Sequence, residues 1–336
     1  MSRDQLIDGE AVFAPLSQFR RIGLAVSGGP DSLALMLLAA DYARTHDQHG
    51  RFTVYSVDHG LRPEAADEVR FVVETAGRLG FAARGLRWEG EKPTTAGQQA
   101  ARQARYSLIA AAMAEDSAEI LVTAHHLGDQ SETVLMRLAH GSGVEGLRGM
   151  DYFAEVAGLA ICRPLLGVDP ADLAALVAAA GLAPVFDPSN RDTDYERVRW
   201  RQMLPQLAAL GLDPRRLSRF ADRMRDADEA IIALAATIEV EETPGAANLQ
   251  RQALIDAPRA VAIRAMANLL RQVGGARKPH DLAPVEALTD RLRAEVALKR
   301  TSLHGCLVSS DGTTIVVARE QGRSGKVQSR RDTAAP

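Results

Sequence analysis

The 336-residue sequence predicts an α/β fold, a doubly wound parallel sheet of the Rossmann-like kind followed by a helical linker and a small α+β domain. Three observations support this prediction. Short β-branched runs alternate with amphipathic helical stretches as far as Ala139, which is typical of β–α–β units in a parallel sheet. A Gly-rich loop follows the first of these runs, and after Gly149 the alternation stops and Arg-rich helical patterns replace it.

Each expected strand of the parallel sheet is a short apolar run, and a helical pattern follows each one. Parallel sheets bind their ligands at the carboxyl ends of the strands, so the loop after each strand is a candidate position for functional side chains. The strand–helix pairs are Arg21–Val26 with a helix from Ser32, Phe52–Val57 with Pro63–Leu79, Ala82–Trp88 with Ala96–Met113, and Glu119–Thr123 with Gln130–Ala139.

The second half of the chain carries different patterns. A hairpin is expected at Asp151–Arg163, an Ala-rich helix from Asp169, and Arg-rich helices over Tyr195–Glu241. A break at residues 243–245 opens a last module, with helices near Pro258–Gln272 and Ala283–Val296 and a hairpin over Thr301–Ala318 that turns at Asp311-Gly312. The expected domains are residues 1–188, 189–242 and 243–320, followed by a disordered tail at 321–336.

Composition excludes several classes of protein. With 40 basic and 43 acidic residues the net charge is −3, and 46% hydrophobic and 25% charged residues are ordinary for a soluble globular protein. The only two cysteines, Cys162 and Cys306, exclude a disulfide framework, a Cys₄ zinc site and a CxxC motif. The N-terminus lacks a signal-peptide pattern, and Gly181 and Pro184 interrupt the most apolar stretch. We therefore expect a soluble cytoplasmic protein without membrane association.

The loop after the first strand is the sharpest functional feature. Its glycines allow a tight turn of backbone N–H groups, Ser32 can cap the following helix, and the helix N-terminus adds positive charge, which together suit a phosphate. The lysine of a P-loop NTPase is missing, and Asp31 is suited to hold a metal that bridges phosphates. The loop consists of Ser27, Gly28, Gly29, Pro30, Asp31 and Ser32.

A second glycine motif has the spacing of a dinucleotide-binding fingerprint. Residues 141–146 read GSGVEG and match G-x-G-x-x-G, but they follow a helix, and we expect no helix after them. The motif therefore lacks its strand–turn–helix context, and a nicotinamide cofactor is not expected.

The loop after the fourth strand combines histidines with carboxylates. His125 and His126 precede a helix start at which Asp129 and Glu132 are three residues apart, so both carboxylates can face the same way. The acidic residues could instead serve only to favour the helix N-terminus. A His-His-x-x-Asp cluster could also hold a metal, as in a metal-dependent phosphoesterase.

Taken in order, these motifs resemble one family. The string SGGPDS matches the SGGxDS signature of the N-type ATP pyrophosphatases, or PP-loop superfamily, and the chain as a whole is similar to the tRNA(Ile)-lysidine synthetases. The resemblance runs from Ile22 to Leu207 and more faintly to Glu320. Its blocks are SGGPDS, VDHGLRPE, ARQARY, TAHHLGDQSETVLMRLAHGSGVEGLRGM, RPLL and DPSNRDTDYERVRWRQMLPQL.

The resemblance implies a ligase that uses ATP and Mg²⁺ to adenylate the carbonyl of the wobble cytidine in an isoleucine tRNA with a CAU anticodon. Free L-lysine then displaces AMP to give lysidine, with pyrophosphate released earlier. Asp31 would bind Mg²⁺, the loop 27–32 would bind the ATP phosphates, and Arg105 would steady the adenylated intermediate. Lysine must be oriented and deprotonated before it attacks, and Asp129 and Glu132 are the candidates for its pocket, with His125 as polar support.

The chain departs from the family pattern at Gly128, where many relatives have an acidic residue, and at Val198, where Arg-Asn-Arg is usual. We also expect no counterpart of the additional C-terminal domain that longer relatives have. Three alternatives stay open. A tRNA thiolase of the same superfamily is disfavoured by the absence of a cysteine pair. A metal-dependent phosphoesterase is disfavoured because the sequence contains no further set of metal ligands with a recognisable spacing. A non-catalytic module that only binds a polyanion is disfavoured because it would not need carboxylates in its binding site.

Basic residues are unevenly distributed. Residues 1–150 contain 15 basic and 19 acidic side chains, whereas residues 151–336 contain 25 and 24. Of the 40 basic residues 36 are Arg, which either GC-rich codon usage or phosphate recognition explains. We expect tRNA to bind, with strong salt dependence, along the Arg-rich helices and the 243–320 module, and the family suggests a homodimer. The expected tRNA-binding residues are Arg191, Arg197, Arg199 and Arg201.

Overall fold

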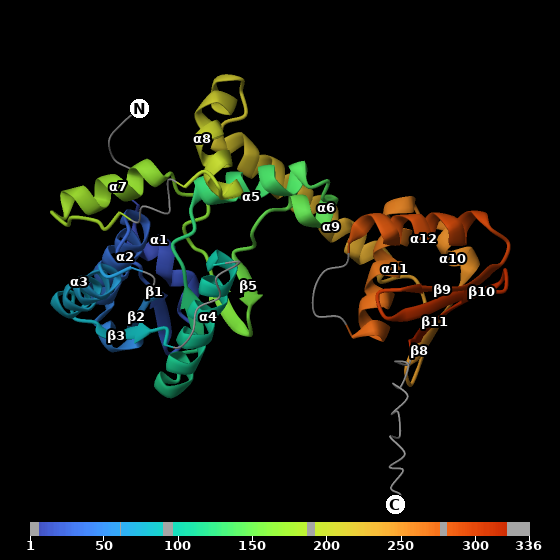
Figure 1. Ribbon diagram of the computed structural model, residues 1–336, viewed down its shortest axis with the longest axis horizontal. Coiled ribbons are helices and arrows are strands. Elements are labelled where there is room, and N and C mark those ends of the chain that lie inside the picture. The colour runs from blue at the N-terminus through green and yellow to red at the C-terminus, as the bar shows by residue number, and fades with distance from the viewer. Residues whose placement is uncertain (1–6, 61, 90–96, 187–191, 276–280, 321–336) are drawn as a thin grey trace, which may run out of the picture. The chain divides into compact units, whose positions relative to one another are not determined.

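A computed structural model describes residues 7–60, 62–89, 97–186, 192–275 and 281–320 (Figure 1). The chain divides into two compact units, residues 1–224 and 225–336. The division falls inside helix α9 (Pro214–Ala235), within the segment that the sequence separates as a helical linker. The expected boundaries at residues 188 and 242 stay predictions, and the expected disordered tail lies outside the described residues.

A six-stranded sheet in the order β3-β2-β1-β4-β6-β5 forms the centre of the first unit. All neighbours pair in parallel except β5, which forms an antiparallel hairpin with β6. The chain starts at the centre and winds outward in both directions, so the fold class predicted from the sequence is confirmed. The carboxyl ends of β1 and β4 flank the switch point at which such sheets bind ligands. The strands are β1 (Ile22–Ala25), β2 (Phe52–Asp58), β3 (Ala82–Arg87), β4 (Ile120–Val122), β5 (Phe153–Val156) and β6 (Leu159–Cys162).

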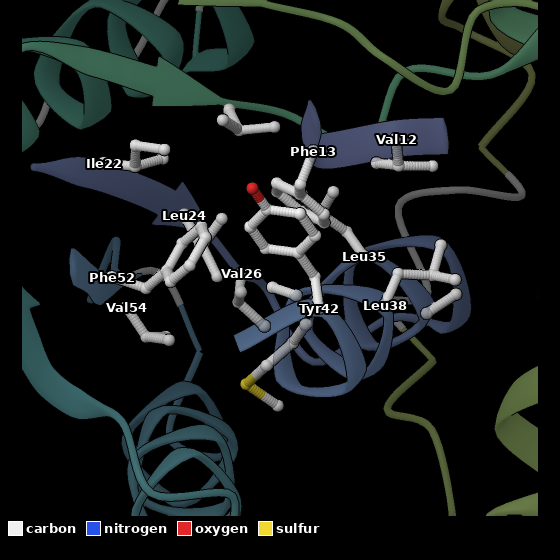
Figure 2. Close-up of a cluster of buried hydrophobic side chains, with 14 of the residues drawn as sticks. Val12, Phe13, Ile22, Leu24, Val26, Leu35, Leu38, Tyr42, Phe52 and Val54 are labelled. Atoms are coloured by element: carbon white, nitrogen blue, oxygen red, sulfur yellow. The ribbon is translucent and has the colours of Figure 1, made fainter. Parts of the chain in front are cut away.

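Alternate side chains of these strands enter two hydrophobic clusters, one on each face of the sheet, as the two-residue period of a strand requires. Val54 belongs to the cluster under α1, α2, α3 and α7, whereas its neighbour Tyr55 belongs to the cluster under α4. Figure 2 shows the first cluster, to which Leu24 and Val54 of the sheet and Leu35 of α2 all belong. Burial on both faces explains why the strands read as nearly continuous apolar runs.

The helices of the first unit cover the sheet or extend from its carboxyl edge. A third hydrophobic cluster, around Val134 and Leu217, joins α5 to α8 and α9. No helix in the described ranges combines the length and the hydropathy that a bilayer-spanning segment needs. The helices are α1 (Gly9–Phe13), α2 (Pro30–His46), α3 (Ala65–Arg78), α4 (Gly97–Asp116), α5 (Leu127–Ala139), α6 (Val144–Leu147), α7 (Pro170–Ala179) and α8 (Glu196–Ala209), with short 3₁₀ turns at Ala14–Leu16 and His49–Arg51.

The second unit is a five-stranded antiparallel sheet, in the order β7-β8-β11-β10-β9, packed against three helices. Its buried core includes Leu249, Met266, Leu288 and Val317. The expected α+β module is therefore present. Its elements are β7 (Glu241–Thr243), β8 (Ala246–Gln250), α10 (Arg251–Asp256), α11 (Arg259–Gly274), α12 (Leu282–Ala294), β9 (Leu298–Leu303), β10 (Cys306–Ser310) and β11 (Thr314–Arg319).

Three local predictions were wrong. The helical pattern expected up to Glu241 ends at Ala235, and the break at 243–245 is the turn of a β7–β8 hairpin, in which Gly245 has φ of +78°. The hairpin expected over Thr301–Ala318 is a three-stranded meander, because His304 and Gly305 both adopt positive φ and make an additional turn. A one-turn helix, α6, does follow the GSGVEG run, although no strand precedes that run.

A buried ion pair in the second unit gives a stability prediction. Asp228 of α9 is fully buried and pairs with Arg264 of α11, whose side chain is 10% exposed. Asp228→Ala would leave the buried guanidinium without this counter-charge and is expected to destabilise the unit by about 3 kcal/mol. The matched control is Asp290→Ala, since the Asp290–Arg259 pair is exposed to solvent and its loss should be close to neutral. Urea denaturation of the full chain measures both, and equal effects would contradict the prediction.

Candidate active site

A cleft of about 600 Å³ opens at the carboxyl edge of the parallel sheet. Its walls come from the β1–α2 loop, the β2–α3 loop, α4, the β4–α5 turn and the segment that follows α7. All of these lie in the first unit. Among the residues predicted from the sequence, the cleft lining includes Ser27, Gly29, Pro30, Asp31, Ser32, Arg105, His125, Asp129 and Arg201.

The β1–α2 loop makes a tight turn at Gly28. Gly28 has φ of +85°, and a Cβ there would lie 3.2 Å from Val185, whose own N–H donates to the Gly28 carbonyl at 2.9 Å. Gly29 is the N-cap of α2, and Pro30 is its first residue. The predicted role of Ser32 as the cap was wrong, because its hydroxyl instead accepts from Ser27 N at 3.2 Å and donates to Gly29 O at 3.0 Å.

No side chain caps α2, so its first N–H groups stay available to a ligand. The first amide bonded within the helix is that of Leu33, to Gly29 O at 3.0 Å. The helix dipole adds partial positive charge at the same point. The loop is therefore an anion cradle of the kind that holds a phosphate.

The turn between β4 and α5 is organised by His126. Its Nδ1 accepts from Gly128 N at 3.0 Å, and Asp129 returns the contact by accepting from His126 N at 3.0 Å, which is a reciprocal capping box. The other ring nitrogen, Nε2, lies 3.5 Å from a carboxylate oxygen of Asp31 and 3.5 Å from one of Asp129. His126 thus connects the phosphate cradle to the α5 carboxylate.

The sequence predicts a role for His125 but not this role of His126. The available signal was the capping-box pattern, a polar residue followed three positions later by an acid at a helix start. Burial alone would lower the pKa of His126, but its contact with Asp31 and the charge of Asp129 raise it above the ordinary value. Burial would raise the pKa of Asp129, but the charges of His126 and Arg197 hold it below its usual range.

His125 lies in a different environment. Its Nδ1 is 2.8 Å from the hydroxyl of Thr123, and the ring lines the cleft. Burial and the charges of nearby arginines lower its pKa to about 3, against the opposing effect of Asp129. His125 is therefore a neutral polar group at physiological pH and cannot act as a cation toward phosphate.

Two arginines of α8 contact the predicted lysine-binding carboxylates. Arg197 donates to Glu132 at 2.7 Å and to Asp129 at 3.1 Å, and Arg201 donates to the other oxygen of Glu132 at 2.6 Å. Glu132 is 1% exposed and does not line the cleft, whereas Asp129 does. Arg199 donates instead to the carbonyls of residues 193 and 194, at 2.8 and 2.9 Å. Arg191, also predicted to bind tRNA, lies outside the described residues.

Asp31 suits the magnesium ion that the sequence resemblance implies. Mg²⁺ in phosphate-transferring sites is usually held by one or two carboxylates together with substrate phosphates. Asp31 supplies one carboxylate in the first turn of α2, beside the anion cradle. Within the described part of the chain no group of three or more His, Cys, Asp and Glu side chains is arranged to hold a metal, so phosphate oxygens would have to complete the coordination.

Comparison with known proteins identifies the family. Residues 5–207 match the family model described as a PP-loop domain. The tRNA(Ile)-lysidine synthase of Rhodopseudomonas palustris is 40% identical over 339 residues, covering 96% of each chain. The protein of the same name from Methylobacterium nodulans is 43% identical, covering 89% of this chain and 90% of its own length. The chain belongs to the tRNA(Ile)-lysidine synthase family of PP-loop enzymes.

A solved structure supports the fold. The U34-tRNA thiolase NcsA from Methanococcus maripaludis, determined with its [4Fe-4S] cluster, matches with a TM-score of 0.53 and 16% identity, covering 64% of this chain and 77% of that one. At this identity the match shows a shared fold alone. In this member of the lysidine synthase family the two cysteines lie one in each unit, and both are buried.

The depressed pKa of His125 gives a testable acid sensitivity. The folded-state pKa of about 3 lies below the unfolded-state value of about 6.5, so folding with a neutral His125 contributes stability above pH 6.5 that is lost progressively as the pH falls toward 3. In His125→Gln the free energy of unfolding should therefore fall less between pH 7 and pH 4.5 than in the original protein, and urea denaturation at the two pH values measures this. By NMR the C2–H resonance of His125 should not shift between pH 5 and 8, and a midpoint near pH 6.5 would contradict the assigned environment.

Proposed function

We propose that this enzyme uses ATP to adenylate the carbonyl oxygen of the wobble cytidine in an isoleucine tRNA with a CAU anticodon. The ε-amine of free L-lysine then displaces AMP to give lysidine. The observation that carries the proposal is the combination of an anion cradle and a cation-binding carboxylate in one cleft. The cradle at residues 27–32 and Asp129 are linked through the ring of His126, and the names of the closely similar relatives agree with this chemistry.

In the first step the cytidine oxygen attacks the α-phosphorus of ATP, the bond to the bridging oxygen breaks, and pyrophosphate leaves. The backbone amides of the β1–α2 loop hold the phosphates. Mg²⁺ held by Asp31 would neutralise charge on the leaving pyrophosphate. Arg105, which lines the cleft from α4, is the cation best suited to steady the adenylated intermediate.

In the second step the lysine ammonium group gives up one proton to water, and the resulting ε-amine attacks the carbon that bears the adenylyl oxygen. AMP leaves with that oxygen, and the nitrogen loses a second proton to water. Asp129 faces the cleft, and its lowered pKa keeps it ionised, so it can bind and orient the ammonium group. Glu132 is 1% exposed and does not line the cleft, so it acts through its neighbours Arg197 and Arg201, which bond its two oxygens. We therefore treat Asp129 as the lysine-binding carboxylate and Glu132 as a positioning residue.

Two alternative functions fit less well. A thiolase mechanism needs a reactive thiolate, whereas burial raises the pKa of the Cys162 thiol to about 11. A metal-dependent phosphoesterase needs a preformed set of protein ligands, and the described residues contain no such set.

The decisive experiment combines the purified protein with ATP, Mg²⁺ and a tRNA transcript that carries the CAU anticodon. Pyrophosphate release is expected to depend on the tRNA, and a lysidine nucleoside should be detected by mass spectrometry only when lysine is present. Release of inorganic phosphate without tRNA would overturn the proposal in favour of phosphoesterase activity.

Substitution of the two cleft carboxylates should separate the two steps. Asp31→Asn is expected to reduce pyrophosphate release on the order of 100-fold or more, because the charge on the phosphates is no longer neutralised. Asp129→Asn should leave pyrophosphate release within a few-fold of the original while adenylated tRNA accumulates and the lysidine yield falls. Asp172→Asn, at an exposed position in the first turn of α7, is the matched control. An unchanged lysidine yield in Asp129→Asn would remove its assigned role.

His126→Asn tests the link between the two halves of the cleft. Asparagine is a good N-cap, so α5 should stay intact and the Tm should fall by no more than about 3 °C. The shorter side chain cannot reach Asp31, so pyrophosphate release should slow on the order of 10- to 100-fold through misplacement of that carboxylate. His126→Ala is the comparison, since it loses the cap as well and should lower both Tm and activity. Full activity in His126→Asn would show that only the cap matters.

A further inference from the structure

The guanidinium of Arg163 is buried with incomplete hydrogen bonding. The residue follows β6 directly, at the carboxyl edge of the sheet, and is 5% exposed. Its Nη1 donates to the carbonyl of Asp151 at 2.8 Å, and its Nε is buried without a partner. The carboxylate of Asp151 is bonded to Arg148, at 2.8 and 3.2 Å. Within the described residues no carboxylate forms an ion pair with Arg163, an arrangement that ordinarily costs stability.

Two further arginines, both on α4, lie over the ring of Tyr106. Arg102 and Arg105 are one helical turn apart on α4, and their guanidinium carbons are 5.2 and 5.5 Å from the centre of the Tyr106 ring. Neither forms an ion pair with a carboxylate in the part of the chain that the structure describes. The charge of Arg102 helps to lower the pKa of Arg163. The charges of Arg102 and Arg163 both help to lower the pKa of His125, so these three groups are within electrostatic range of one another.

We call these three residues the arginine cluster. Arg105, Tyr106 and His125 line the cleft, and Arg102 is exposed. In the sheet β4 separates β6, which carries Arg163, from β1, which leads into the phosphate cradle. An anion bound near Arg163 would therefore lie two strands away from the phosphates held by the amides of α2.

The chemistry of the cluster identifies the anion. Arginine forks match phosphate oxygens, and arginines that pair with no carboxylate in the described part of the chain favour a group that stays negative at all working pH values. A nucleotide that reacts while part of an intact strand brings a phosphodiester on each side, and the target base has to leave the stack to reach the cleft. An exposed Arg102 beside a cleft-lining Arg105 suits a chain that continues into solvent.

We propose that the arginine cluster binds a backbone phosphate of the tRNA next to the nucleotide that is modified. Arg102 contacts the phosphate, and Arg163 adds positive charge that forms no ion pair with a carboxylate among the described residues, while Arg105 stays with the adenylated intermediate. This inference rests on the proposed function in one respect, that the substrate is an RNA strand.

The first test measures equilibrium binding of the CAU-anticodon tRNA in the absence of ATP and lysine. Arg102→Gln should weaken binding about 10-fold and lower the slope of log affinity against log salt by about 1. Binding of ATP alone should be unchanged. Arg70→Gln is the matched control, because Arg70 is exposed on α3 and pairs with Asp67 of the same helix. Weaker ATP binding with unchanged tRNA binding would overturn the proposal.

The second test separates function from structure at Arg163. Arg163→Met keeps the apolar stem and removes the charge, so we expect an unchanged or higher Tm together with about 10-fold weaker tRNA binding. A lower Tm with unchanged tRNA affinity would assign Arg163 to the fold and overturn its part in the site.

The third test uses tRNAs in which one phosphate beside the wobble cytidine is replaced by an uncharged methylphosphonate. One of the two replacements should weaken binding to the unaltered protein about 10-fold and have no further effect on Arg102→Gln. The assignment would be overturned if each of the two replacements weakened binding to Arg102→Gln as much as it weakens binding to the unaltered protein. All three tests measure binding alone, so a failure of lysidine formation would be seen separately from a failure of this site.

Discussion

The contact on which the cleft depends is the ring of His126. One nitrogen accepts from the Gly128 amide at the start of α5, and the other lies between the carboxylates of Asp31 and Asp129. Because the ring is buried and its cap contact fixes its orientation, Asp31 and Asp129 are held at a constant separation. Two groups that belong to different helices, and that are proposed to act in different steps, are in this way positioned by a single side chain.

The way the helices are capped determines which charge each side of the cleft can accept. Helices α2 and α5 both begin at the carboxyl edge of the sheet, and each begins with partial positive charge. His126 and Asp129 satisfy the first amides of α5, so that helix presents a carboxylate to the cleft. Helix α2 has Gly29 at its cap and no side chain bonded there, so its amides remain available to an anion. One cleft can therefore bind a phosphate and an ammonium group side by side.

The sequence predicted the parallel sheet and the location of the cleft well, because both depend on local patterns. Apolar runs, the SGGPDS loop and the spacing of Asp129 and Glu132 are all contained within a few residues of chain. The contacts of Glu132 with Arg197 and Arg201 could not be predicted, since they depend on how α8 packs against α5. The role of Arg163 was missed for a similar reason: an arginine after a strand looks exposed until its neighbours show that it is buried.

The pairing of Glu132 also changes which arginines of α8 can serve RNA. Withdrawing Arg197 or Arg201 toward a phosphate would leave a carboxylate that is 1% exposed without one of its partners, and breaking a buried pair of this kind costs several kcal/mol. Arg199 carries no such cost, because it donates to two backbone carbonyls and forms no ion pair with a carboxylate in the described ranges. Of the three α8 arginines expected to bind tRNA, Arg199 is therefore the one whose charge can meet a phosphate without disturbing the cleft.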